Sequence, residues 1–215
     1  MTPIVQAVPT RVSILARLIP AISYALPALG AALSALLFIG VMEAMRNAES
    51  AGIAAVAGGM SKANVSTVIA LYLAVFVGLI GIVVGIVRCV STTTTASPAS
   101  WFFLVAGILG LAPVLTLWQA ESLLLEVITS RSGPGIVAVA NQISMLLMLT
   151  IGLAAVGVLI LLVASVIPLP AAVRAKRKWA PLIVLVIMEL ALMAMTVHYH
   201  LRTAWFYDVR LTERF

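Results

Sequence analysis

The chain has 215 residues, of which 63% are hydrophobic and only 9% are charged, and its formal net charge is +6. A soluble domain of this composition would lack the polar groups that its surface needs, so the composition excludes a soluble globular protein and predicts an integral membrane protein. The single cysteine, Cys89, excludes an internal disulfide and a thiolate metal site with the usual number of ligands.

Five apolar runs are long enough to cross about 30 Å of hydrocarbon as helices, which takes roughly 20 residues each. They lie at about residues 19–45, 58–88, 101–128, 136–169 and 180–201. Strands of a membrane barrel would be about ten residues long with alternating polarity, a pattern that the sequence does not contain. The sequence therefore predicts an all-α, polytopic integral membrane protein with about five transmembrane helices.

The first run is too long for a cleavable signal peptide and follows Arg11 and Arg17. We therefore expect residues 1–18 to form an N-terminal cytoplasmic segment and the first run to stay in the mature protein as a span.

The first two spans and the next two are predicted to be copies of one helical hairpin. Residues 52–57 (Gly-Ile-Ala-Ala-Val-Ala) return 83 positions later as residues 135–140 (Gly-Ile-Val-Ala-Val-Ala), and the same offset relates Thr67 to Thr150. We place the first hairpin at 19–90, a Ser/Thr-rich linker at 91–100 and the second hairpin at 101–170. Residues 171–215 hold a basic loop, the fifth span and an aromatic tail.

Hydroxyl side chains are predicted to face each other inside each hairpin. Residues equally distant from the tip of an antiparallel hairpin lie at the same depth, because both helices rise about 1.5 Å per residue. This rule pairs Ser34 with Thr67 in the first hairpin and Thr116 with Thr150 in the second. A hydroxyl in a membrane helix often bonds only to its own backbone, which is the alternative reading of each.

Carboxyl groups within spans are the second set of candidates, because an unpaired charge in hydrocarbon is costly and usually has a function. Glu121 lies about three turns from the second tip, and Glu189 lies near the middle of the fifth span. Both are candidates for a proton path. Glu189 is predicted to bind a proton or a partner, and the alternative for it is a neutral acid bonded to a neighbouring helix. The depth rule also places Glu126 level with Asn141, and Ser122 level with Ser144, as a polar seam in the outer half.

Small residues mark the predicted contacts between helices, as glycine does where membrane helices approach closely. The candidates are Gly30, Gly81, Gly85, Gly107 and Gly110.

A basic cluster before the fifth span sets the predicted orientation, because Lys and Arg in short loops resist translocation. The cluster is Arg174, Lys176, Arg177 and Lys178. It predicts a multi-pass protein of a bacterial inner membrane with a cytoplasmic N-terminus, and a cluster that touches anionic lipid; nucleic acid is not expected as a partner.

The first hairpin resembles the paired helices of the proton-channel stator family that includes TolQ, ExbB and MotA. Residues 29–35 (Leu-Gly-Ala-Ala-Leu-Ser-Ala) are similar to the family's first arm, and residues 56–67, which end Asn-Val-Ser-Thr, are similar to its second arm. Ser34 and Thr67 stand where the family has its two channel hydroxyls. The second hairpin resembles a more degenerate copy, with Thr150 at the second of these positions.

The resemblance implies a stator-like subunit that lines a proton pathway with a single-span partner carrying an intramembrane acid, and couples proton-motive force to work. It also implies a homo-oligomer within a multi-subunit membrane complex. The family's acid before the second-arm threonine is replaced by Lys62 here, and no sizeable soluble domain is predicted. A non-catalytic structural or anchor subunit is therefore the alternative, and a transporter driven by Glu189 or Glu121 is the third hypothesis.

An enzyme and a cofactor are not predicted. The two histidines, His198 and His200, are two residues apart and point to different sides of a helix, so one chain cannot ligate a haem axially with them. The sequence contains no phosphate-binding loop, nucleophile elbow or metal-binding spacing.

Overall fold

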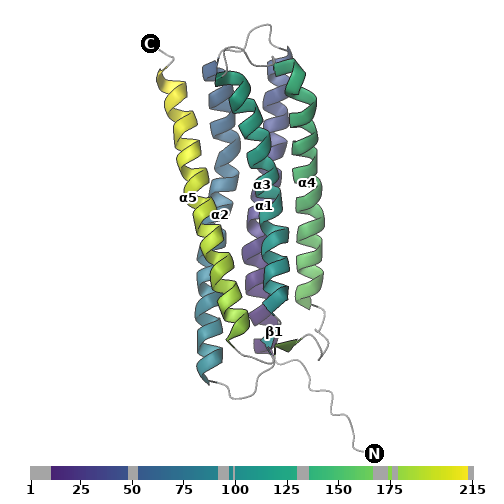
Figure 1. Cartoon of the computed structure of the whole chain (residues 1–215), viewed down its shortest axis with the longest axis vertical. Helices are drawn as coiled ribbons and strands as arrows, with labels where there is room; N and C mark the ends of the chain where they lie inside the picture. The colour runs from purple at the N-terminus through teal and green to yellow at the C-terminus, as the bar shows by residue number, and fades with distance from the viewer. Residues whose placement is uncertain are drawn as a thin grey trace, which may run out of the picture.

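The computed structural model describes residues 11–47, 53–91, 97–98, 100–129, 136–166, 174–175 and 179–212. Five long helices run along the long axis of the molecule (Figure 1). In chain order they are α1 (Arg11–Asn47), α2 (Ile53–Ser91), α3 (Ser100–Thr129), α4 (Ile136–Val166) and α5 (Ala180–Thr212). Two short strands, β1 (Ser97–Pro98) and β2 (Arg174–Ala175), pair antiparallel, with Ser97 opposite Ala175 and Pro98 opposite Arg174.

Each helix contains a segment that is long and apolar enough to cross a membrane. The five segments are Leu18–Glu43, Ala57–Val87, Trp101–Val127, Val139–Ser165 and Ala180–Asp208. Large apolar side chains such as Leu36, Phe76 and Val83 are exposed on the outside of the bundle, where lipid would contact them. The protein is therefore an all-α polytopic membrane protein of two helical hairpins and a C-terminal span, as the sequence predicted.

Two helices extend beyond the predicted spans. Residues 11–17, predicted as part of the N-terminal segment, already belong to α1, whose apolar segment begins at Leu18. The aromatic tail is helical as far as Thr212, where α5 ends. In the basic cluster, Arg174 lies in β2, whereas Lys176, Arg177 and Lys178 fall outside the described residues.

The hairpins are joined through α1, which contacts α2, α3 and α4, while α5 packs against α2 and α3. Figure 1 shows α5 and α4 at opposite edges of the bundle. The start of α1 and the end of α5 lie at opposite ends of the molecule, as an odd number of spans requires.

The buried face of α5 repeats at intervals of four and three residues. It carries Leu185, Glu189, Leu192, Thr196, Tyr199 and Phe206, all at most 4% exposed. This spacing is typical of left-handed packing between nearly parallel helices. Three of the six are polar, so α5 brings polar groups into a contact that is otherwise apolar.

All five predicted packing glycines lie against a neighbouring helix. A Cβ atom at Gly30 would meet Ala70 on α2, and one at Gly110 would overlap the backbone carbonyl of Tyr24 on α1. The others face Ile19 (Gly81), Leu182 (Gly85) and Met188 (Gly107). Gly78 and Gly157, which the sequence analysis did not single out, also lie in such contacts.

Gly157 of α4 leaves space for a backbone carbonyl of α3 that Pro113 deprives of its helical hydrogen bond. Proline lacks an N–H group, so the carbonyl of Leu109, four residues earlier in α3, loses its usual helical partner. A Cβ at position 157 would lie 3.0 Å from that carbonyl oxygen, and glycine leaves the space for it. Weak Cα–H···O contacts are common at such helix crossings.

Replacing Gly110 by alanine is expected to destabilise the bundle by about 1–3 kcal/mol, the usual cost of overpacking. The added atom would meet backbone on α1, which cannot move aside as a flexible side chain could. Thermal unfolding in detergent would measure the change. Gly40→Ala and Gly152→Ala are matched controls, because no atom lies within 4 Å of a Cβ at either position. Equal stability of all three variants would contradict the packing described for Gly110.

Candidate functional site

The first hairpin holds a cluster of three hydroxyl groups between α1 and α2. The Ser34 hydroxyl lies 2.7 Å from the Thr67 hydroxyl and 2.7 Å from the Ser66 hydroxyl. Ser34 donates to the carbonyl of Ala63 at 2.6 Å and accepts the backbone N–H of Thr67 at 3.2 Å. Ser34 and Thr67 are fully buried. The predicted pairing of their hydroxyls is therefore confirmed, and Ser66 joins them.

Gly30 makes this close approach of the two helices possible. It lies one turn before Ser34, and a Cβ there would be 3.1 Å from the Ser66 carbonyl oxygen and 3.2 Å from the Thr67 Cα. Small residues let membrane helices come close enough for short side chains such as serine to meet across the contact.

The second hairpin repeats the arrangement in a simpler form. The hydroxyls of Thr116 and Thr150 lie 2.8 Å apart, which confirms the second predicted pair. Each also reaches its own helix: Thr116 donates to the Pro113 carbonyl at 2.9 Å, and Thr150 to the Leu146 carbonyl at 2.8 Å. Both interpretations of membrane hydroxyls therefore apply to this pair: the two hydroxyls face each other, and each also bonds to the backbone of its own helix.

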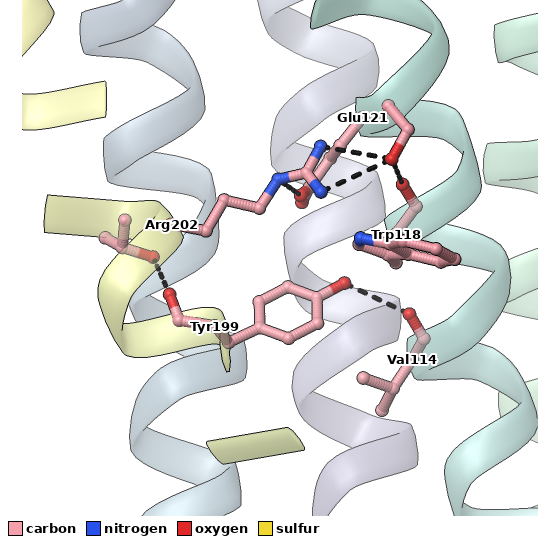
Figure 2. Close-up of polar contacts among 7 residues, drawn as sticks. Val114, Trp118, Glu121, Tyr199 and Arg202 are labelled. Carbon is pink, nitrogen blue, oxygen red and sulfur yellow. Dashed lines mark hydrogen bonds and ion pairs between the residues drawn. The ribbon is translucent and has the colours of Figure 1, made fainter. Parts of the chain in front are cut away.

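An ion pair lies inside the membrane segment between α3 and α5 (Figure 2). Glu121 is fully buried, and its Oε2 atom lies 3.1 Å from Nε of Arg202. The other two guanidinium nitrogens donate to the Ser122 hydroxyl at 3.3 and 3.4 Å. That hydroxyl donates to the Trp118 carbonyl at 2.8 Å, so the guanidinium is held from α3 at two successive residues.

Arg202 is the functional candidate that sequence reasoning missed. The sequence places it near the outer end of the fifth span, where an arginine can extend into water. In the structure its side chain is only 11% exposed and points inward to Glu121. The available signal was the spacing of Arg202 from Glu189 and Tyr199, which puts all three near the buried face of α5.

Two further polar side chains border the ion pair. Tyr199, one turn before Arg202, is fully buried and donates its hydroxyl to the Val114 carbonyl at 3.0 Å (Figure 2). Asn64 of α2, one turn before Thr67, is also fully buried, and its carboxamide makes no hydrogen bond with the described residues. The ion pair and the hydroxyl cluster lie around one apolar core, which includes Ala31, Ala63 and Ala120.

These residues form one polar layer, which we call the upper site: Ser34, Asn64, Ser66, Thr67, Glu121 and Arg202. Its members come from α1, α2, α3 and α5. Hydroxyls can donate or accept, a carboxyl can take up or release a proton, and a guanidinium keeps its charge. The arrangement is chemically able to pass a proton between neighbouring oxygens while Arg202 stabilises the anionic form of Glu121.

Glu189 is not part of the upper site. It is 2% exposed, and its carboxyl lies against the backbone of Gly78 on α2. Arg202 follows Glu189 by 13 residues in α5, which separates the two by about 20 Å along the helix. The structure thus places the two hydroxyls of the first hairpin and Glu121 around one apolar core, and keeps Glu189 apart from them, toward the opposite half of the spans.

The four residues of the predicted polar seam do not lie together. Glu126, Asn141 and Ser144 are exposed, whereas Ser122 is half-buried and accepts from Arg202. An open groove of about 380 Å³ is lined by Trp118, Gln119, Ser122, Leu123, Glu126, Gln142 and Leu146. Asn141 and Ser144 are not among its lining residues, so the predicted pairs of the seam do not meet across the groove.

The remaining charged and titratable candidates lie on the surface. Glu43 and Lys62 are exposed, and an exposed lysine in this position can extend toward the interface. His198 meets the ring of Trp118 on α3, and His200 meets the ring of Tyr72 on α2, each with ring centroids 6.0 Å apart. The two histidines therefore diverge, as their spacing predicted.

No protein-family model matches the chain, and neither the curated proteins nor the solved structures contain a significant match to it. The resemblance to the stator family remains an expectation from the sequence.

Proposed function

We propose that this protein is a membrane subunit that forms a proton pathway through its helical bundle, with the upper site as its outer half. The observation that carries the proposal is the presence of a buried carboxyl, held by Arg202, and of a cluster of three hydroxyls around the same apolar core. Hydroxyls that only hold two helices together do not require a carboxyl in the same core, and an ion pair that only holds two helices together does not require a hydroxyl cluster. The combination of the two therefore favours a proton pathway.

The ion pair suits a proton relay because it holds a carboxyl at a depth where a lone anion would be costly. Glu121 lies eight residues before the end of α3, about 12 Å along the helix axis. Arg202 offsets the charge of the anion, and uptake of a proton by Glu121 would release the guanidinium. A proton released by Glu121 would reach the hydroxyl cluster through a water molecule beside Asn64, because a carboxamide holds its own protons and does not relay one.

The hydroxyl cluster suits the next step because its bonds can reverse. The Ser34 hydroxyl has one proton, which it can donate to the Ala63 carbonyl, to Ser66 or to Thr67, and it can accept from a neighbouring hydroxyl to which it does not donate. A chain of hydroxyls can therefore pass a proton and reset, with no fixed charge to trap it.

Below Thr67 the buried residues of α2 are apolar, namely Ala70, Leu71 and Ala74. A proton would cross this level only if water entered or the helices moved. We therefore infer that the described conformation is a closed one.

The stator resemblance would add a single-span partner that supplies the acid and further copies that complete a ring. In the present bundle, α5 already brings an acid, Glu189, and the counter-ion of Glu121 to the hairpins. We propose that the pathway is completed within one chain and that α5 takes the place of such a partner. A bacterial inner membrane with the N-terminus in the cytoplasm remains the proposed location, on the strength of the basic cluster around Arg174.

The test is proton flux into liposomes that contain the purified protein, driven by a membrane potential. Ser34→Ala/Thr67→Val removes the hydroxyl pair of the first hairpin and is expected to lower flux by about tenfold, which corresponds to about 1.4 kcal/mol of added barrier. Thr116→Val/Thr150→Val is the matched control, because it removes the same chemistry from the second hairpin, where no carboxyl is in contact with the pair. Equal flux in both double variants would show that the hydroxyls of Ser34 and Thr67 are not part of the pathway.

The alternative function, a non-catalytic subunit of a larger membrane complex, is favoured by one observation. Gln119 and Gln142 are exposed in the groove between α3 and α4, and uncharged amides facing lipid lack hydrogen-bond partners. This alternative predicts that the protein conducts no protons and purifies with a fixed partner subunit. It also predicts that the partner subunit no longer copurifies with the Gln119→Leu/Gln142→Leu variant.

A further inference from the structure

A second buried polar site lies at the other end of the spans, around Glu189. Its carboxyl packs so closely on α2 that a Cβ at Gly78 would overlap it. Both carboxyl oxygens are buried and make no hydrogen bond with the described residues. Glycine at position 78 is therefore what allows this acid to lie inside the contact between α2 and α5.

The Tyr24 side chain of α1 faces the same place. It is fully buried, and its hydroxyl also lacks a hydrogen-bond partner among the described residues. Ser23, next to it, donates to the Ala74 carbonyl at 2.8 Å, which fixes α1 to α2 one turn before Gly78. Two buried side chains from different helices, each with an oxygen that lacks a hydrogen-bond partner, thus lie beside the same stretch of α2.

No charged residue other than Glu189 lies in the described helical segments at the level of Glu189. The sequence contains no titratable or charged residue other than Tyr24 and Glu189 within 18–34 of α1, 73–87 of α2, 100–115 of α3, 151–166 of α4 and 180–197 of α5. Arg88 is ten residues beyond Gly78, about 15 Å along α2, and Arg17 is seven residues before Tyr24, about 10 Å along α1. The nearest fixed charges are therefore near the ends of the helices.

We propose that Glu189, Tyr24 and Gly78 form a proton-binding site that holds α5 against α2 when it is occupied. One carboxyl and one phenol are fewer oxygen ligands than a hard metal cation takes, and the described residues contain no group of three or more acidic, histidine or cysteine side chains, so a proton is the ligand that fits. The protonated carboxyl is neutral and can remain in the contact.

Loss of the proton would leave an uncompensated anion between two apolar helices, and such a charge is expelled or solvated rather than kept dry. Glu189 would then have to turn toward water, and α5 would have to shift away from Gly78. Proton binding at this site and the position of α5 are consequently linked, and any conformational change that α5 undergoes would depend on pH. This site is separate from the upper site and does not require that the protein conduct protons.

The distance between α2 and α5 tests the proposal in the full chain. Spin labels at Val83 and Ile187, both exposed on the outside of the bundle, report it in lipid nanodiscs in a Cys89→Ser background. Between mildly acidic and strongly alkaline pH, the label distance is expected to lengthen by roughly 5 Å, about one helical turn. Labels at Leu36 and Ile69, on the two helices of the first hairpin, are the control and are expected to show no change.

Glu189→Gln keeps the shape of the protonated acid and cannot ionise, so its α2 to α5 distance is expected to stay short at every pH. Infrared difference spectra between the same pH values give a second readout, namely the loss of a protonated carboxyl band that is missing in Glu189→Gln. A pH-independent distance in the unsubstituted protein, or an unchanged pH response in Glu189→Gln, would overturn the proposal.

Discussion

Replacing Arg202 by methionine is expected to destabilise the protein by about 3 kcal/mol, because removal of one member of a buried ion pair leaves the other charge uncompensated. Glu121 is fully buried, and Arg202 lies 3.1 Å from its carboxyl. Methionine retains the apolar stem of the side chain, so the decrease in the free energy of unfolding measures the removal of the charge rather than a loss of packing. Unfolding by denaturing detergent in mixed micelles would measure it.

Adding Glu121→Gln to Arg202→Met is expected to recover most of the lost stability, since a neutral pair of similar volume carries no desolvated charge. The double-mutant cycle should give a coupling energy of about 2 kcal/mol. Lys62→Met is the matched control, because this lysine also lies within a span but is exposed. Its replacement should change the free energy of unfolding by less than about 0.5 kcal/mol. Additive effects of the two substitutions would contradict a direct ion pair.

The neutral variant Glu121→Gln/Arg202→Gln is expected to fold and to lose proton flux by about 100-fold. Without a group that can be ionised at this depth, a proton must cross as an uncompensated charge, which costs about 2.5–3.5 kcal/mol at the centre of a membrane helix. Flux into liposomes at equal protein content would measure the change. Undiminished flux in a correctly folded variant would exclude Glu121 from the pathway.

Single substitutions at this pair would be harder to interpret. Glu121→Gln alone leaves Arg202 buried without its counter-ion, so a lower flux could follow from misfolding. The neutral double variant separates the two effects, because stability and flux are expected to change independently in it.

The sequence was sufficient for the contacts that lie within one hairpin. Both helices of a hairpin rise by the same amount per residue, and the tip sets their relative register, so the partners of Ser34 and Thr116 follow from counting. The glycine contacts could be located for a similar reason, since a glycine in an apolar helix marks a close approach whatever the partner is.

The contacts of α5 could not be predicted in this way. No short turn connects it to the helices that it touches, so neither its depth nor its rotation follows from the repeat. The pairs Arg202 with Glu121 and Glu189 with Gly78 both depend on that placement. Uniformly apolar helices also give little information on which face is buried, because lipid and protein interior favour the same side chains.

The polar seam shows the limit of the depth rule. The rule correctly identifies residues at one level, but it does not determine which side of a helix faces the partner. Asn141 and Ser144 are at the predicted level in α4 and yet point outward, whereas Leu147 and Thr150 point into the bundle.

The most direct test of the proposed proton pathway is the flux of the unsubstituted protein in sealed liposomes under an imposed potassium diffusion potential. The interior of the liposomes is expected to acidify more than that of protein-free liposomes. This acidification is expected to persist when potassium and the buffer salts are the only other ions present. Liposomes that contain the folded protein and are no more permeable to protons than empty ones would contradict it.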